Sequence, residues 1–253
     1  MNPALRGSAA HVFVSSLVAP QLTDEDEHHL RRVLRIRDSD VVTLSDGIGS
    51  WTTARLTASG LETTSAPTVE PMPPRSGVMS AIPKGDRPEW TVQKLTEIGI
   101  GTIGFIDCAR SVVRWDEARA RKQSERLRRV AREAAMQSRR VWLPEVCEVV
   151  PFPQAAGISG VALADPDGDA LDPQTHTILV GPEGGFTQGE RDVVGRHGRG
   201  PYSSGLAVGF RTLAAQRSVS TFCRTTSSTT STGLRAPGRV CSDRRSLREG
   251  GDR

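Results

Sequence analysis

The residues best suited to binding a ligand form a glycine-rich turn between an apolar run, residues 177–180, and a predicted helix. The turn consists of Gly181, Pro182, Glu183, Gly184 and Gly185. Glycine has no Cβ atom, so backbone amides there can approach a ligand closely. Thr187 and Glu190 have the spacing of a helix-capping box, which predicts a helix directly after the turn. Because α/β sheets bind ligands at the carboxyl ends of their strands, the turn is a candidate binding site, with an ordinary strand-to-helix connection as the alternative.

Several other kinds of site are disfavoured by missing residues. The turn lacks the lysine and hydroxyl of a phosphate loop, and no GxGxxG pattern occurs. Residues 165–169 resemble a calcium loop without its closing glutamate, which favours a solvated turn. His28 and His29 have no partners at metal-ligand spacing, and the cysteines form no CxxC pair. We therefore expect no metal site, and reduced, non-catalytic thiols at Cys108, Cys147, Cys223 and Cys241.

The first 70 residues predict a small β-rich module. Thr23 and Asp26 can cap a helix. The apolar stripe of this helix would be formed by Leu30, Val33 and Leu34. Two strand-like runs, residues 41–44 and 51–56, flank residues 45–49, which have hairpin chemistry. Four prolines within residues 66–74 then predict an extended linker, so we place a domain boundary at residue 70.

Beyond the linker, strands alternate with helices, a pattern typical of a parallel sheet covered by helices. Strands are expected over residues 78–82, 101–106, 161–164 and 177–180. Asp86 and Glu89 have capping-box spacing and predict a helix that ends at Gly99. Its inward-facing residues would be Val92, Leu95 and Ile98. The fold class is therefore α/β.

A long helix is predicted over about residues 116–139. Its buried positions would be Leu127, Val130, Ala131 and Ala134. A neighbouring polar stripe recurs at spacings of three and four: Arg126, Arg129, Glu133, Gln137 and Arg140. The helix is also rich in arginine, as is the segment with Arg31, Arg32, Arg35 and Arg37. A charged run is usually a solvated face, but two such runs beside a candidate site predict contacts with RNA phosphates.

Motifs that follow one another in a fixed order resemble a known family. They are residues 28–35, followed by 46–49, then 84–90, 93–99, 133–140 and the glycine turn. Together they resemble the ribosomal small-subunit RNA uridine-N3 methyltransferases of the knotted SPOUT superfamily. The resemblance implies a PUA-like RNA-binding β-barrel over residues 1–70 and a trefoil-knotted methyltransferase domain over residues 71–215. It further implies S-adenosylmethionine as cofactor, and a cytoplasmic homodimer that acts on 16S ribosomal RNA, in the assembled small subunit.

The resemblance also implies roles for individual residues. The cofactor would be bound by Val180, Gly181, Pro182, Glu183, Gly184, Gly185, Phe210 and Arg211. Substrate RNA would be contacted by Arg31, Arg32, Arg35, Gln93, Lys94, Glu97, Arg126, Arg129 and Gln137. Methylation of uridine N3 requires loss of the N3 proton, because the lone pair is otherwise held in the N–H bond. We assign stabilisation of the resulting charge to Arg140 or Lys84, and proton abstraction to Glu133.

The carboxyl-terminal part departs from the family pattern. Residues 205–215 match only imperfectly the segment that threads the knot and closes over the cofactor. Residues 225–232 are eight consecutive serines and threonines, and residues 196–253 hold eleven arginines against three acidic residues. The net charge of +4 therefore owes much to this tail and is no evidence of RNA binding by itself. We interpret residues 216–253 as a disordered tail or, preferably, a frame-shift product.

Two alternatives to a methyltransferase stay open at this point. An RNA-binding protein with impaired or absent catalysis would result if the altered carboxyl-terminal part prevents cofactor binding. A nucleotide-binding α/β enzyme is disfavoured by the missing phosphate-loop and dinucleotide patterns. No apolar run approaches the roughly 20 residues that cross a bilayer, and residues 1–11 lack the apolar core of a signal peptide, so we expect no membrane partner.

Overall fold

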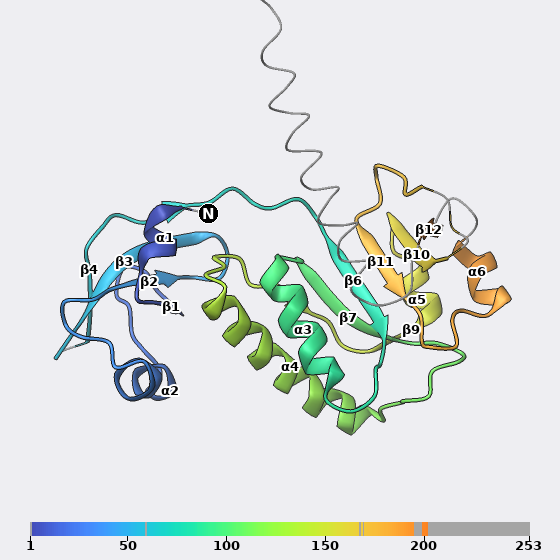
Figure 1. The fold of residues 1–253 in the computed structure, drawn as a ribbon, viewed down its shortest axis with the longest axis horizontal. Helices are drawn as coiled ribbons and strands as arrows, with labels where there is room; N and C mark the ends of the chain where they lie inside the picture. The colour runs from blue at the N-terminus through green and yellow to red at the C-terminus, as the bar shows by residue number, and fades with distance from the viewer. Residues whose placement is uncertain (1, 59, 167, 169, 195–198, 202–253) are drawn as a thin grey trace, which may run out of the picture. The chain divides into compact units, whose positions relative to one another are not determined.

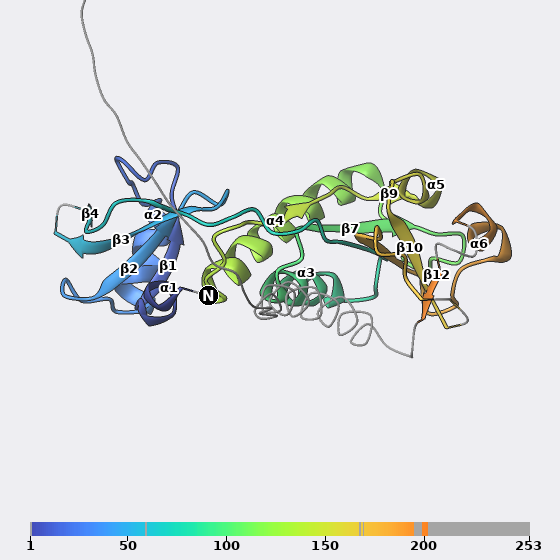
Figure 2. The same cartoon turned by 90° about the horizontal axis from the view of Figure 1, so that it is seen from above.

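The chain contains two β-sheets, seen in a computed structural model that describes residues 2–58, 60–166, 168, 170–194 and 199–201 (Figures 1 and 2). All described residues lie in one compact unit. The division into domains at residues 70 and 215 stays a prediction. The predicted knot depends on residues 205–215, which lie outside the described residues.

The amino-terminal sheet has five strands, with neighbours in the order β1-β2-β3-β4 and β5 paired with β3. Its strands are β1 (Ala10–Phe13), β2 (Val41–Ser45), β3 (Ser50–Thr57), β4 (Gly60–Thr63) and β5 (Thr68–Val69). Its helices are α1 (Pro3–Gly7), α2 (Asp24–His28) and the π-helix η1 (His29–Val33). The predicted hairpin is confirmed, because Asp46 Oδ1 accepts hydrogen bonds from the backbone N–H groups of Ile48 and Ser50 between β2 and β3.

The second sheet is parallel throughout and has the order β12-β10-β11-β6-β7-β8, with β9 paired to β7. Its strands are β6 (Gly77–Ala81), β7 (Thr102–Asp107), β8 (Glu145–Val146), β9 (Val150–Pro151), β10 (Val161–Asp165), β11 (Thr177–Val180) and β12 (Arg199–Pro201). Its helices are α3 (Arg87–Ile98), α4 (Glu117–Gln137), α5 (Phe152–Ala156) and α6 (Gln188–Val194). This confirms the predicted α/β class.

The chain reverses its direction of travel across this sheet. From β6 it moves one way, through α3 to β7 and through α4 to β8, and the later strands β10 and β11 lie on the other side of β6. β6 and β11 are therefore neighbouring strands, and the chain segments that follow them lead to opposite sides of the sheet. Such a point leaves a crevice outside the carboxyl ends of the two strands, where open α/β sheets bind ligands.

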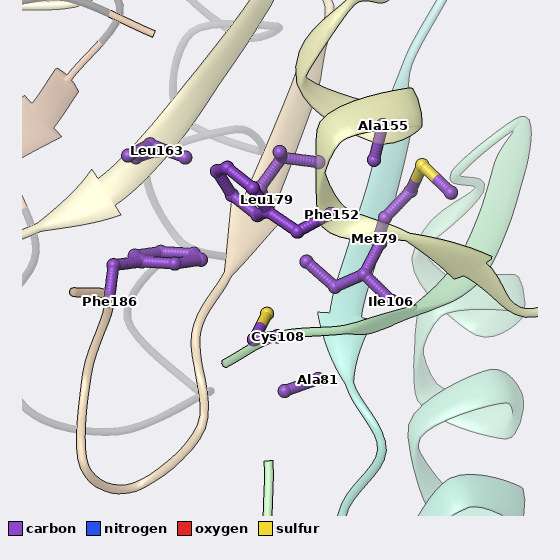
Figure 3. Packing of buried hydrophobic residues seen from close by; sticks show 9 residues of the cluster. All are labelled: Met79, Ala81, Ile106, Cys108, Phe152, Ala155, Leu163, Leu179 and Phe186. Carbon is purple, nitrogen blue, oxygen red and sulfur yellow. The ribbon is translucent and has the colours of Figure 1, made fainter. Parts of the chain in front are cut away.

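The core of the second sheet follows from strands that are apolar on both faces. Every residue of β6 and β11 is buried, as expected for central strands of a covered parallel sheet. Met79, Ile106 and Leu179 pack with Phe152 of α5 and with Phe186, which follows the glycine turn (Figure 3). The rings of Phe152 and Phe186 lie 5.5 Å apart. The turn is thereby anchored to the core through its carboxyl-terminal flank.

Helix α3 matches its prediction except at two positions. Val92 and Leu95 are buried, and Gly99 ends the helix in a left-handed conformation with φ of 83°. Ile98, predicted to face inward, is 39% exposed. Asp86 makes no side-chain capping bond, so the predicted capping box is wrong. Glu89 instead forms an ion pair with Arg126 of α4, so the Glu89 carboxylate does not cap α3.

The helix predicted after Thr23 also differs from the expected register. Thr23 Oγ1 accepts a hydrogen bond from Asp26 N, as predicted, and Leu30 is fully buried. Val33 and Leu34, however, are 60% and 42% exposed. Residues 29–33 form a π-helix, in which the Leu34 N–H bonds to the His29 carbonyl five residues earlier. The wider turn moves both side chains off the face that a spacing of three or four would give them.

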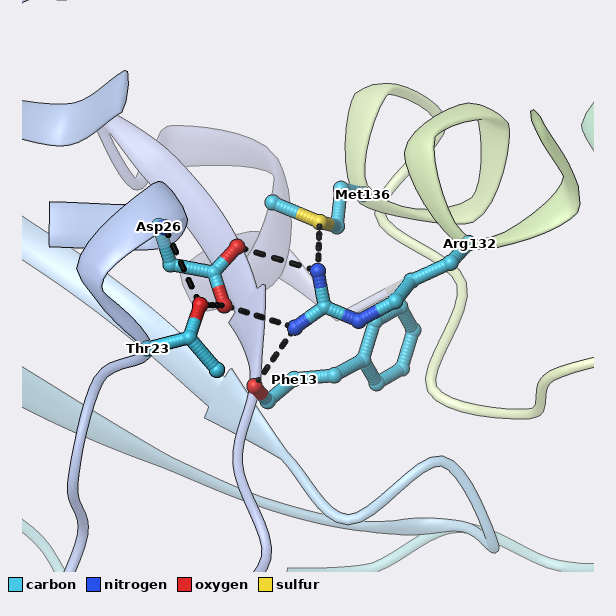
Figure 4. Close-up of polar contacts among 5 residues, drawn as sticks. All are labelled: Phe13, Thr23, Asp26, Arg132 and Met136. Atoms are coloured by element: carbon cyan, nitrogen blue, oxygen red, sulfur yellow. Dashed lines mark hydrogen bonds and ion pairs between the residues drawn. The ribbon is translucent and has the colours of Figure 1, made fainter. Parts of the chain in front are cut away.

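An ion pair joins the amino-terminal elements to α4. Arg132 donates 2.9 Å and 2.8 Å hydrogen bonds to the two carboxylate oxygens of Asp26, and another to the Phe13 carbonyl (Figure 4). Its guanidinium carbon also lies 5.9 Å from the centre of the Phe13 ring. Burial alone would raise the pKa of the Asp26 carboxyl, but the hydrogen bonds from Arg132 and Thr23 and the charge of Arg132 bring this pKa below its ordinary value.

Buried His11 forms a second connection between the same parts. One ring nitrogen lies 2.9 Å from Thr43 Oγ1 and the other 3.1 Å from the Arg140 carbonyl oxygen. Burial lowers the pKa of His11 to about 4; the hydrogen bond to the Arg140 carbonyl opposes this shift, and the charge of Arg139 adds to it. His11 is therefore neutral at pH 7, and it carries no charge that would need a buried partner.

Replacing Arg132 by Met should destabilise the protein, because it leaves the buried Asp26 carboxylate without its partner. We expect a loss of about 2 kcal/mol at pH 7 in urea unfolding, below the range of about 3–5 kcal/mol for fully buried pairs because Arg132 is 34% exposed. The matched control is Arg121→Met, which removes an exposed pair with Glu117 and should change stability by less than about 0.5 kcal/mol.

The same variant should show a characteristic pH dependence. The Asp26 pKa is depressed in the folded protein, so its stabilisation is present above the unfolded pKa of about 3.9 and is lost as pH falls through the folded value. The difference between wild type and Arg132→Met should therefore narrow below about pH 4. A difference that stays constant from pH 7 to pH 3 would contradict this account of the ion pair.

Candidate functional site

A cavity of about 670 Å³ opens at the carboxyl ends of β6, β11 and β10. Its walls are the end of β6 with Ile82 and Pro83, the start of α3, the end of β10, and the glycine turn. From α3 it takes Arg87, Trp90 and Thr91. Cavities of about 300–1,000 Å³ are typical of small-molecule and cofactor sites. The cavity thus lies at the reversal of strand order, and we call it the switch-point cavity.

The glycine turn forms one wall of this cavity through its backbone. Gly185 has φ of 70°, a backbone conformation that residues with a Cβ atom rarely adopt. Its N–H donates a 2.8 Å hydrogen bond to the Pro182 carbonyl. A Cβ on Gly181 would lie 3.1 Å from the Phe186 ring. Backbone shape therefore favours glycine at position 185, and a Cβ at position 181 would require the Phe186 ring to shift by a few tenths of an ångström. Gly184 has room for a side chain, because the nearest atom to a Cβ there would be 3.7 Å away.

The buried carboxylate of Glu190 holds the turn in place. Glu190 Oε2 accepts hydrogen bonds from the N–H and the hydroxyl of Thr187, and Thr187 Oγ1 accepts one from Glu190 N, which confirms the predicted capping box. The other oxygen of Glu190 accepts a 2.8 Å bond from the backbone N–H of Ala109, directly after β7. One side chain thereby ties the segment after β11 to the segment after β7, across the end of β6.

Arg110 makes a second tie between the same two segments. Its Nη1 donates a 2.8 Å hydrogen bond to the carbonyl of Gly184, at the centre of the turn. No sequence signal pointed to this residue, because the contact joins positions 74 residues apart. The turn is consequently supported on both sides, at Gly184 and at Thr187.

A buried acid at the end of β10 also lines the switch-point cavity. Asp165 is only 1% exposed, and its carboxylate lies 3.4 Å from Nε of Arg191 in α6. The sequence interpretation of residues 165–169 as a solvated turn is therefore wrong for Asp165, which belongs to β10; Asp167 and Asp169 lie outside the described residues. Arg191 lines the cavity as well, so this wall carries a carboxylate paired with a guanidinium.

The predicted substrate residues lie mostly on another flank of α3. Gln93, Arg129, Glu133 and Gln137 line a groove of about 780 Å³ bounded by α2, α3 and α4, which we call the helix groove. Gln93 faces the helix groove, whereas Arg87 and Thr91 lie on another flank of α3 and Trp90, three residues before Gln93, lies between the two flanks. Lys94 and Glu97 form an ion pair of 2.8 Å on the flank of Trp90. The structure therefore gathers four of these residues, but not around the glycine turn.

Of the two candidates for charge stabilisation, Arg140 lies far from the cavity and Lys84 near it. Arg140 Nη2 donates a hydrogen bond to the Glu97 carbonyl, at the carboxyl-terminal end of α3. Ten residues of helix, about 15 Å, separate Glu97 from Arg87 at the cavity. Lys84 is exposed beside Pro83, which lines the cavity. The catalytic roles of both residues stay predictions.

The predicted RNA-contacting arginines differ in how they are engaged. Arg31 pairs with Glu27 and donates to the Thr57 carbonyl, whereas Arg32 and Arg35 are exposed. Arg126 pairs with Glu89. The predicted cofactor residues Phe210 and Arg211 lie outside the described residues.

Burial makes the Cys108 thiol unreactive. Burial, together with the charges of Glu190 and Asp107, raises its pKa to about 12. Within the described ranges, no group of three or more His, Cys, Asp or Glu side chains could hold a metal ion. None of the helices in that part of the chain is both long enough and apolar enough to cross a membrane.

Two family models match this chain. Residues 70–206, which include the switch-point cavity, match the RNA methyltransferase domain, and residues 22–62 match the RNA methyltransferase PUA domain. Among curated relatives, the ribosomal RNA small subunit methyltransferase E of Mycobacterium bovis is 32% identical over 193 residues, which cover 68% of this chain and 74% of the relative. The protein of the same name from Bacillus subtilis is 29% identical over 198 residues, covering 67% and 75%.

Solved structures show the same fold. A ribosomal RNA small subunit methyltransferase E from Neisseria gonorrhoeae, bound to S-adenosyl methionine, superposes with a TM-score of 0.68 at 24% identity, covering 83% of this chain and 97% of that one. A probable rRNA-methyltransferase from Porphyromonas gingivalis superposes with a TM-score of 0.64 at 26% identity, covering 84% and 97%.

Proposed function

The chain belongs to the family of RNA methyltransferases that carry a PUA domain, and we propose that it transfers the methyl group of S-adenosylmethionine to a uridine of 16S ribosomal RNA. The related proteins from Mycobacterium bovis and Bacillus subtilis are named for the ribosomal RNA of the small subunit. The acceptor atom in this proposal is N3 of the uracil ring. The proposed setting is the cytoplasm, with the assembled small subunit as substrate.

The observation that carries the proposal is the switch-point cavity with its supported glycine turn. Its volume of about 670 Å³ suits a nucleoside-sized cofactor. Apolar walls from Ile82, Val180 and Phe186 suit an adenine ring, and the Asp165–Arg191 ion pair provides polar groups for the polar part of the ligand. When bound, S-adenosylmethionine supplies a methyl group activated by its sulfonium charge. The residues of the cavity would bind and orient it.

Binding of S-adenosylmethionine should depend on the shape of the turn. Gly185→Val places a β-branched residue at φ of 70°, so we expect at least a tenfold rise in Kd in calorimetric titration of the full-length protein. Gly184→Val is a weaker test, because Gly184 has room for a Cβ. The matched control is Gly189→Ala in α6, where a Cβ would meet no atom within 4 Å, so Kd should stay unchanged. A wild-type protein without saturable binding would contradict the proposal.

Methyl transfer to N3 needs a group that favours the deprotonated base. Lys84 is suited to this role in its own chain, because it is an exposed residue of the turn between β6 and α3 and directly follows Pro83, which lines the cavity. A positive charge there would stabilise the negative charge that spreads onto the uracil oxygens when the N3 proton leaves. Glu133 would accept the proton.

We propose that a second copy of the chain supplies Glu133 in the proposed homodimer. In one chain, Glu133 and Gln137 line the helix groove, on another flank of α3 from the cavity. A helix with its side chains is about 10 Å thick, whereas reacting atoms must approach within about 3.5 Å. A two-fold symmetric dimer could bring the helix groove of one copy to the cavity of the other.

Two inactive variants should therefore restore activity when they are combined in one dimer. Gly185→Val and Glu133→Ala, co-expressed and purified through different tags so that only mixed dimers are kept, should give about half of wild-type methyl transfer, because each mixed dimer has one intact site of two. Each variant expressed alone is the control and should be nearly inactive. Mixed dimers without activity would contradict a site shared between copies, and full activity of Glu133→Ala alone would contradict its role as base.

The alternative of an RNA-binding protein without catalysis is disfavoured by the comparisons, because the family match covers the cavity and reaches residue 206. That alternative depended on residues 205–215, which lie outside the described residues. The interpretation of residues 216–253 as a frame-shift product stays a prediction.

A further inference from the structure

A second, polar pocket lies beside the switch-point cavity. It has a volume of about 590 Å³, and Pro83 lines both. Its walls come from the starts of α3 and α4 and from residues 112–115, and they include Arg114, Arg119 and Arg126. We call it the arginine pocket. We propose that it binds a backbone phosphate of the RNA nucleotide next to the target uridine, an inference that rests on the proposed function.

The charge of the arginine pocket favours a phosphate. Its three arginines face two lining carboxylates, Asp86 and Glu89. Glu89 pairs with Arg126 and Arg114 with Asp107 at 3.5 Å, whereas Arg119 has no ion pair among the described residues. A guanidinium offers several N–H donors in a fixed plane, which matches the oxygens of a phosphate. Arg119 is therefore the residue most available to an incoming phosphodiester.

The backbone adds positive potential at the same place. Helices α3 and α4, of 12 and 21 residues, both begin at the pocket. The amino-terminal end of a helix carries a partial positive charge from its unpaired N–H groups. The Asp86 side chain accepts no hydrogen bond from the first turn of α3, so it leaves the N–H groups of that turn available. In α4, by contrast, Asp116 Oδ1 accepts a hydrogen bond from Arg119 N, so it is the start of α3 that reinforces the arginines.

The helix groove is a poorer place for a phosphate. Its lining carboxylates are Glu25, Asp26, Glu89 and Glu133, against the two arginines Arg129 and Arg132. Asp26 is neutralised by Arg132 and Glu89 by Arg126, which leaves Glu25 and Glu133 against Arg129. The balance of charge would repel a phosphate from the helix groove, so the RNA backbone should pass over the arginine pocket on its way to the switch-point cavity.

Arg119 and Arg121 provide a matched test on one helix. Arg119 lines the pocket, whereas Arg121 does not and pairs with Glu117 at 3.2 Å on the exposed surface. In filter binding of full-length protein to transcribed 16S ribosomal RNA, Arg119→Gln should raise Kd about three- to tenfold and reduce the slope of log K against log salt by about one. Arg121→Gln should leave both quantities at their wild-type values.

Equal effects of the two variants, or no effect of Arg119→Gln, would overturn the arginine pocket as a phosphate site. Calorimetric titration with S-adenosylmethionine separates this failure from that of the proposed function. Arg119→Gln should keep the wild-type Kd for S-adenosylmethionine, since Arg119 does not line the switch-point cavity. Loss of cofactor binding in Arg119→Gln would show a general structural defect and would also overturn the proposal. Absence of cofactor binding in the wild type would overturn the proposed function instead.

Discussion

The reversal of strand order between β6 and β11 is the constraint on which the rest of the site depends. Segments that leave the two strands diverge, and the crevice between them is the switch-point cavity. A crevice alone would be lined by loose connections. Here Glu190 and Arg110 tie the turn after β11 to the segment after β7, so the glycine backbone is held in one shape. Because the turn is already ordered before a ligand binds, it loses less conformational entropy on binding.

The parallel direction of the strands also decides where the polar residues lie. Helices α3 and α4 both begin at the carboxyl edge of the sheet and run away from it. Residues early in these helices, such as Arg87 and Arg119, are therefore near the cavity, whereas Arg140, which follows the end of α4, is distant. The amino-terminal elements are attached at the distant end, through Asp26 and His11.

Local features of the fold could be predicted from the sequence, because neighbouring residues determine them. The Thr187–Glu190 capping box, the end of α3 at Gly99 and the limits of β11 all agree with prediction. Predictions were wrong where a distant partner or an unusual turn intervened. Glu89 pairs with Arg126 instead of capping α3, and the π-helix changes the register of Val33 and Leu34. Arg110 and Asp165 were missed as site residues because their importance depends on contacts formed only in the folded chain.

The most direct test of the account is the chemical identity of its product. Purified protein, labelled S-adenosylmethionine and small ribosomal subunits lacking the modification would be incubated, and the ribosomal RNA digested and analysed by mass spectrometry. The account predicts one N3-methyluridine for each 16S ribosomal RNA, at a single position. Label transferred to another base, to another atom of uracil, or to no nucleotide at all would contradict it.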